Sequence, residues 1–471
     1  MKRQITTIAL AASAALLGAC AVPGPAPKDP PALEQPAGGA VTVAPDWWKR
    51  FGDARIDALV DEALAHNRDL ARAMARIDES RALLRGALAE RWPAVSASLA
   101  GTRARVTENG SVPLGGASPL GNDFRAALNV SYEVDLWGRV ASSSAAARDE
   151  LLAGEFARDT LRTALAAQVV QGYATLQGLD AQIRIYQEVL KWQRESLRLQ
   201  GLRMKAGELA ELDWVQLEAE LLNSELQLPK LERARGEAER ALALLLGRSP
   251  KALVEQGVER ADAPNGGAQA LPSGLPSDLL LRRPDVQAAE ARLRAAGARV
   301  DAARAAYFPS ITLSAGLGQE SSQLSRLFDG PSLIWNVAAA LAQPIWNAGR
   351  IDAQVEATRA RQAQIELDYR DAVTAAFKEA RDALAAHGEA QASLTSSRKR
   401  AEALTRAADL TRLRFQGGES SRLQLIDAER LALLAQLQAA DAQRAVVAAQ
   451  AELFRALGGG WQKPGLATAA R

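Results

Sequence analysis

Two segments of the chain alternate apolar and polar residues in the manner of β-strands that have one apolar and one polar face. Every second residue from Phe124 to Leu136 is apolar, and the residues between them are mostly polar. In a second segment, apolar and polar or small residues alternate in the same way: Ile311, Leu313, Ala315 and Leu317 with Thr312, Ser314, Gly316 and Gly318. Together with the neighbouring apolar runs, these segments predict two β-hairpins, at about 93–136 and 309–346.

A very long helix is predicted after each hairpin. Residues 138–204 and 349–415 contain no proline and are rich in Ala, Leu, Arg and Glu, over 67 residues in each case. In the first of these stretches the apolar residues recur at a spacing near 3.6: Leu161, Leu165, Val169, Tyr173, Leu176, Leu179, Ile183, Tyr186, Leu190 and Leu197. Each helix would be about 100 Å long, so it must lie against other helices along its length.

Shorter helices are predicted at about 54–91 and 208–246 in the first half of the chain, and at about 284–307 and 419–457 in the second half. Stacked end to end, the two short helices of one half match its long helix in length. Each half therefore supplies two helical columns, one continuous and one spliced from two helices. Pro229, which has Ala440 opposite it in the second half, is a candidate for a kink in the first spliced column only.

The same order of elements occurs twice because the chain is internally duplicated. Gly138-Arg139 matches Gly349-Arg350 at a separation of 211 residues, and RMKAGE at Arg203 matches RFQGGE at Arg414 at the same separation. We therefore assign residues 46–246 to a first repeat, 247–277 to a linker at the equatorial level of the splice, 278–461 to a second repeat, and 462–471 to a C-terminal tail.

The N-terminus carries the features of an export signal followed by a lipid attachment site. A basic start and an apolar core predict a signal peptide over residues 1–19. The sequence LLGAC, which ends at Cys20, resembles a bacterial lipobox and implies covalent lipid on Cys20; a chance cysteine beside a plain cleavage site is the alternative. Ala21 stands where lipoproteins of the inner membrane usually have Asp, which points to the outer membrane. The rest of 20–45 is rich in Pro and Gly and predicts an extended tether.

The predicted strands have the length that a tilted strand needs to cross a membrane, although a soluble sheet with one apolar face would show the same pattern. Four strands cannot close a barrel, and an open edge in lipid would leave backbone groups unpaired. A membrane barrel must therefore be shared between chains. Two chains would give eight strands and a nearly filled interior, whereas three would give twelve strands and an open lumen. Twelve helical columns would likewise make a ring roughly 38 Å across.

The junctions between hairpin and long helix are the first candidate functional positions. Gly138-Arg139 and Gly349-Arg350 would let an extended strand turn directly into a helix. Trp137 and Trp346 suit the membrane interface, where indole rings collect. Simple packing in a protein core is the alternative for both tryptophans.

Charge and composition exclude several other functions. Lys and Arg number 57 against 55 Asp and Glu, which lacks the basic excess expected of a nucleic-acid-binding protein. The chain has no GxxxxGK[ST] loop, so energy for transport would have to come from a partner. His66 and His387 have no metal-ligand spacing around them, and no pairing of nucleophile and base is visible for a hydrolase. We expect neither enzyme activity nor a metal or other cofactor beyond the lipid on Cys20.

An ordered set of motifs resembles the outer-membrane factor (TolC-like) family, and in particular its efflux lipoprotein branch: LLGAC, WWKRFGD, RWPAVSASLAG, DLWGR, LLLRRPDVQAAEARLRAAGARVDAARAAYFPSITLSAGLG, LRFQGGESSRLQLIDAERLAL and ALGGGW. The resemblance covers nearly the whole mature chain. It implies a mainly α-helical protein that forms a homotrimer, with a twelve-stranded barrel in the outer membrane of a Gram-negative bacterium and a helical tube crossing the periplasm. It also implies a passive exit duct for drugs or other small molecules, together with a periplasmic adaptor and an inner-membrane, proton-driven pump.

The resemblance also locates a gate. It implies that the turn from Arg414 to Arg422 lies at the periplasmic tip and that Leu423 and Asp427, four residues apart on one helix face, ring the constriction. Three copies of Asp427 would favour cations, and Arg430 is a candidate partner that holds the ring shut. Some relatives carry a second acid where this chain has Gln424. An ordinary solvated surface position is the alternative for Asp427.

A periplasmic coiled-coil scaffold or adaptor lipoprotein is the rival interpretation of the long helices. It does not account for the duplicated hairpins. The sequence contains nothing that selects among drugs, metals, solvents and peptides as cargo.

Overall fold

A computed structural model of the chain describes residues 46–107, 118–255, 257–260 and 282–459. Several sequence assignments fall outside the described residues. These are the signal peptide, Cys20 with its tether, most of the linker and the C-terminal tail.

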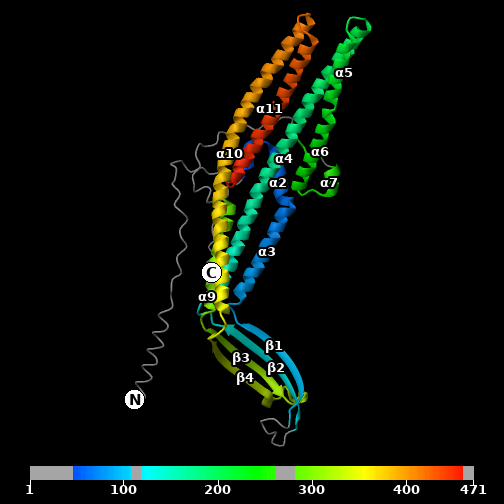
Figure 1. The fold of residues 1–471 in the computed structure, drawn as a ribbon. Helices are drawn as coiled ribbons and strands as arrows, with labels where there is room; N and C mark the ends of the chain where they lie inside the picture. The colour runs from blue at the N-terminus through cyan, green and yellow to red at the C-terminus, as the bar shows by residue number, and fades with distance from the viewer. Residues whose placement is uncertain (1–45, 108–117, 256, 261–281, 460–471) are drawn as a thin grey trace.

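The molecule is elongated, with a β-sheet at one end and helical hairpins reaching the other (Figure 1). Two helices run most of its length: α4 (Arg139–Lys205) and α10 (Arg350–Gln416), each of 67 residues. Their ends lie within one residue of the predicted 138–204 and 349–415. The absence of proline over these stretches leaves the backbone hydrogen-bond ladder uninterrupted.

The shorter helices pack along these two. In the first repeat they are α2 (Ala54–His66), α3 (Arg68–Ala89), α5 (Glu211–Glu225) and α6 (Gln227–Leu245), preceded by the short 3₁₀ helix η1 (Trp47–Phe51) and followed by α7 (Pro250–Glu255). In the second repeat they are α9 (Pro284–Ala305) and α11 (Arg422–Ala456).

The prediction of one helix over 54–91 is wrong, because Asn67 divides it into α2 and α3. The Asn67 side chain accepts hydrogen bonds from the backbone N–H groups of Asp69 and Leu70, at 2.8 and 3.1 Å. Its amide nitrogen donates to the carbonyl oxygen of Leu245, 2.8 Å away. Asn67 therefore caps α3 and ties it to the end of α6.

The helix predicted over 208–246, with Pro229 as a candidate kink, is divided into α5 and α6 at Leu226. Pro229 gives the physical reason, since it has no N–H to donate to the carbonyl of Glu225 and its ring crowds that carbonyl. In the second repeat α11 is continuous through Ala440. The interruption is therefore confined to the repeat that contains the proline.

The four strands form one antiparallel sheet in the order β1 (Ala94–Arg105), β2 (Leu120–Glu133), β3 (Ser310–Ser321) and β4 (Leu333–Ala342). The central β2–β3 pairing joins the two repeats, and the short 3₁₀ helices η2 (Leu324–Arg326) and η3 (Gly330–Ser332) lie between β3 and β4. The strands stop earlier than predicted, at Glu133 and Ala342. Several residues therefore separate each hairpin from its long helix.

The strand register gives the sheet one apolar and one polar face. Ala97, Leu128, Leu317 and Trp335 form one row across the four strands, and Ser96, Asn129, Gly316 and Asn336 form the next. On the apolar face Leu128, Leu317 and Trp335 are 52%, 55% and 73% exposed. A soluble monomer would not leave such a surface uncovered, so this face favours contact with lipid over a water-soluble sheet.

The main hydrophobic core lies midway along the molecule. Trp47 is fully buried and stacks on Phe454, with ring centroids 5.1 Å apart. Around this pair, buried side chains of η1, α2, α4, α6 and α11 form one cluster. This core joins the beginning of the first repeat to the end of the second. None of the helices in the described part of the chain is long and apolar enough to cross a membrane.

Gly247, at the end of α6, tests this packing. Its φ is +74°, and a Cβ there would collide with the carbonyl oxygen of His66. We expect Gly247→Ala to lower stability by about 2 kcal/mol or more, because both the left-handed backbone and the collision oppose it. Gly86, in the last turn of α3 with open space around it, is the control. Thermal unfolding of purified protein should show a clear loss for Gly247→Ala and none for Gly86→Ala, and equal effects would contradict this account.

Candidate functional site

The first junction turns the chain through Gly138, which has a left-handed φ of +73° directly before α4. Asp135 caps the helix across this turn. Its two carboxylate oxygens accept the backbone N–H groups of Val140 and Ala141, at 3.1 and 2.7 Å. A carboxylate at a helix N-terminus also interacts favourably with the helix dipole. The combination of a glycine and an aspartate therefore starts α4 within a few residues of the end of β2.

Arg139 reinforces the same turn. Its guanidinium group forms two hydrogen bonds with the Glu133 carboxylate, at 2.8 and 2.9 Å, and lies 3.7 Å from Glu90. The paired geometry fits a guanidinium fork to a carboxylate. Arg139 thus fastens the first turn of α4 to the last residue of β2.

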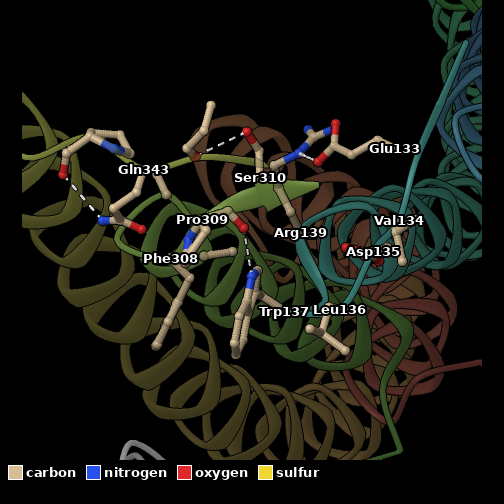
Figure 2. Close-up of a pocket in the computed structure, with 14 residues that line it drawn as sticks. Glu133, Val134, Asp135, Leu136, Trp137, Arg139, Phe308, Pro309, Ser310 and Gln343 are labelled. Atoms are coloured by element: carbon tan, nitrogen blue, oxygen red, sulfur yellow. Dashed lines mark hydrogen bonds and ion pairs between the residues drawn. The ribbon is translucent and has the colours of Figure 1, made fainter. Parts of the chain in front are cut away.

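Trp137 packs inside the junction, as Figure 2 shows. Its ring stacks on Phe308 with the centroids 4.7 Å apart, and its indole N–H donates to the carbonyl oxygen of Pro309 at 2.7 Å. These partners belong to the second repeat and border a cavity of about 520 Å³. The contacts favour the packing alternative for Trp137. Its assignment to the membrane interface remains a prediction.

The second junction is built differently. Gly349 has a φ of +80°, but the preceding residue is Ala348, with a φ of +54° that is unusual for a residue with a side chain. At the repeat separation of 211, Trp346 lies opposite Asp135 and not opposite Trp137. Trp346 is 87% exposed and Arg350 is also exposed. In the single chain, these two predicted site residues therefore face outward and not into a protein core.

The opposite end of the molecule carries two matching helical turns. Gly207 and Gly418 have φ values of +78° and +79°, and each is followed by a glutamate whose N–H returns to an arginine carbonyl, at 2.9 Å and 2.8 Å. At the start of α11, Ser421 and Gln424 form a capping box. The Gln424 side chain is thus used by the turn, at the position where some relatives have a second acid.

The three predicted gate residues lie just beyond this turn on α11. Leu423 is 64% exposed, and the side chains of Asp427 and Arg430 are 52% and 57% exposed. Arg430 pairs with Asp427 of its own chain at 3.3 Å. Such an exposed pair contributes little to stability. The described chain therefore offers these three side chains to a neighbour or to a lumen.

A partly buried charged cluster next to the gate was not identified from the sequence. Glu429 lies within 3.2 Å of Arg412 on α10, and burial raises its pKa to about 7. Leu425, four residues earlier on the same helix face, is buried, and this spacing could have revealed the position. At the repeat separation of 211, Glu429 stands opposite Glu218 of the first repeat.

Neither histidine has the surroundings of a metal ligand. His387 is buried in α10, where its Nε2 lies 3.0 Å from the Gln391 amide nitrogen, and burial lowers its pKa. His66 ends α2. Within the described ranges no three His, Cys, Asp or Glu side chains come close enough together to hold a metal ion.

A sheet with one exposed apolar face, continued by helices about 100 Å long, defines the subunit of an outer-membrane channel. The family model for outer membrane efflux proteins matches residues 59–248 and 275–459. The chain belongs to this family.

Individual relatives agree with this assignment. The probable outer membrane lipoprotein SilC of Salmonella typhimurium is 34% identical over 418 residues, 88% of each chain. Outer membrane protein OprJ of Pseudomonas aeruginosa is 34% identical over 427 residues, 90% of this chain and 88% of its own. The crystal structure of the Campylobacter jejuni CmeC outer membrane channel superposes with a TM-score of 0.87 at 26% identity, covering 92% of this chain and 91% of that one.

These similarities confirm the predicted class, fold and location. The protein is an outer-membrane efflux channel protein whose helices extend into the periplasm, and the scaffold or adaptor alternative is not supported. Its relatives are channel proteins and not enzymes.

The cap at the first junction yields a stability prediction. Asp135→Ala removes the acceptor for two N–H groups at the start of α4, and we expect a loss of about 1–2 kcal/mol. Asp135→Asn keeps an acceptor oxygen and should lose much less. Thermal unfolding of the two variants checks this, and equal losses would show that the cap is not what stabilises the turn.

Proposed function

We propose that three copies of this chain form a passive exit duct in a tripartite efflux pump, with a gate at the periplasmic tip. The observation that supports this most is the sheet of four strands with β1 and β4 at open edges and an exposed apolar face. In lipid each unpaired backbone group costs several kcal/mol. Pairing β1 of one copy with β4 of the next removes both edges.

The number three follows from the width of the lumen. Two copies would supply eight strands, an interior that side chains nearly fill. Three copies supply twelve strands, and the face that would line the lumen carries small or polar residues such as Ser96, Asn129, Gly316 and Asn336. Three copies would also bring twelve helical columns together, which would close into a tube through the periplasm.

The partners follow from what the chain lacks and what it exposes. No nucleotide-binding loop is present in the sequence, so a partner would supply the energy. The resemblance to the efflux lipoprotein branch favours a proton-driven pump in the inner membrane, reached through a periplasmic adaptor. Apolar side chains remain exposed near the tip, among them Leu202, Leu212 and Leu413, at 57%, 67% and 64%. They are available to neighbouring copies and to the adaptor. Lipid on Cys20 would add a further anchor in the outer membrane, since several acyl chains hold a protein firmly.

Overall sequence similarity to the relatives does not identify the cargo of this chain. Relatives with names that specify antibiotics, cations, toluene and pyoverdine are all 33–34% identical to this chain. A duct that contacts its solutes weakly would leave the choice of cargo to the pump. We therefore assign drugs or other small molecules as a class.

The gate predicts a change in ion selectivity. A ring of three Asp427 carboxylates attracts cations, so Asp427→Asn should shift the permeability ratio of cations to anions toward one, by about two-fold or more. Single-channel recording in planar bilayers measures this ratio.

Arg430→Gln is the companion variant, because it removes the partner of Asp427 and keeps the acidic ring. It should retain cation preference and open more often. If the wild-type protein passes no ions, the duct proposal fails. If it conducts and Asp427→Asn leaves selectivity unchanged, only the assignment of the gate fails.

A further inference from the structure

One arginine of α10 contacts both helical hairpins of the tip, α4–α5 and α10–α11. The Arg412 guanidinium lies over the ring of Trp192 on α4, with 4.8 Å between the guanidinium carbon and the ring centroid. The same guanidinium hydrogen-bonds the Glu429 carboxylate on α11, at 3.2 and 3.3 Å, and Asp409 on α10 at 2.9 Å. A guanidinium is attracted to the face of an indole ring, and hydration of the guanidinium would weaken this attraction if the site opened.

Arg422 completes this group, which we call the Glu429 cluster: Trp192, Arg412, Phe415, Arg422 and Glu429. Arg422 is only 8% exposed, and its guanidinium lies 4.4 Å from the centroid of the Phe415 ring. Its Nε and one terminal nitrogen find no hydrogen-bond partner among the described residues. A buried guanidinium without its hydrogen bonds is unfavourable, so the tip holds a charged group that a movement toward water would relieve.

Every helix packed at this level contributes charge. Arg412 and Asp409 face Glu429 from α10, and Arg422 faces it from α11 itself. Asp213 of α5 and Arg203 of α4 act on Arg422. The carboxylate of Glu429 therefore has two cations near it, and yet burial outweighs both.

We propose that Glu429 is a proton-controlled switch of the tip, which keeps the two helical hairpins together when it is protonated and favours their separation when it is charged. This proposal rests on the duct and tip gate proposed above. Its geometric basis is that Arg412 touches both α4 and Glu429. A change at Glu429 therefore reaches the contact between the hairpins directly.

The direction of the pH effect follows from the relative proton affinities. Burial raises the pKa of Glu429 to about 7 from 4.5, so the packed tip binds the proton more tightly than an open tip that exposes the carboxylate to water. The packed arrangement is therefore fully favoured below pH 4.5 and loses that advantage as the pH rises through about 7. One unit of difference in pKa changes the ratio of packed to open tips ten-fold.

The test is single-channel recording of the full-length protein in planar bilayers between pH 5.5 and 8.5. Wild-type open probability should rise by about ten-fold or more across pH 7. Glu429→Gln imitates the neutral carboxyl, so its open probability should show no pH step and stay at or below the wild-type value at pH 5.5 throughout. The matched control is Glu218→Gln, at the equivalent position of the first repeat, which should keep the wild-type step. A pH step that survives in Glu429→Gln, or that disappears equally in Glu218→Gln, would overturn the proposal.

A second measurement works even if the purified channel stays shut. Hydrogen exchange of peptides from the α10–α11 turn should be faster in the wild type than in Glu429→Gln at pH 8, and the ratio of the two rates should be about ten-fold or more smaller at pH 5.5. Comparing the two proteins at the same pH removes the intrinsic pH dependence of exchange. Equal exchange at pH 8 would overturn the switch. A protein that never conducts but shows this difference would instead count against the duct.

Discussion

The two open edges of the sheet are the constraint on which the rest of the structure depends. β1 and β4 are the outer strands of the sheet, and each has a row of backbone groups without a partner among the described residues; lipid offers none. A single chain therefore leaves both sheet edges open, although its hydrophobic core is well packed. The single chain exposes large apolar side chains, such as Trp335, Trp346 and Leu423. Such exposure would be unfavourable in a soluble protein, and cover by lipid or by other copies of the chain explains it.

Packing and charge compensation differ along the length of the molecule. At the middle, Trp47 and Phe454 bring the start and the end of the chain into one well-packed core. At the membrane end, Asp135 and Arg139 hold the strand and the helix in a fixed relation. At the tip, by contrast, Arg422 and Glu429 bury charge that is incompletely compensated. A well-packed middle and an incompletely compensated tip fit the gate proposed at this end.

Much of the fold could be predicted from the sequence, because its largest features are periodic. The ends of α4 and α10 followed from proline-free helical sequence, and the duplication gave the second repeat from the first. The features that could not be predicted depend on tertiary contacts. Asn67 divides a helix by bonding Leu245, which is 178 residues away, and Trp137 finds its partners in the other repeat. The spacing of Leu425 and Glu429 places Glu429 on the inward face of α11, but its ion pair with Arg412 of α10 depends on tertiary contact.

Cysteine cross-linking between copies tests the central claim most directly. Pairs of cysteines, one in β1 and one in β4, would be introduced into the full-length chain, with each single cysteine as its control. If these edges pair around a closed ring, oxidation in the membrane should give covalent dimers and trimers and then stop, with nothing larger than three chains. Chains that stay monomeric with every pair, or a ladder that continues beyond three, would contradict the account.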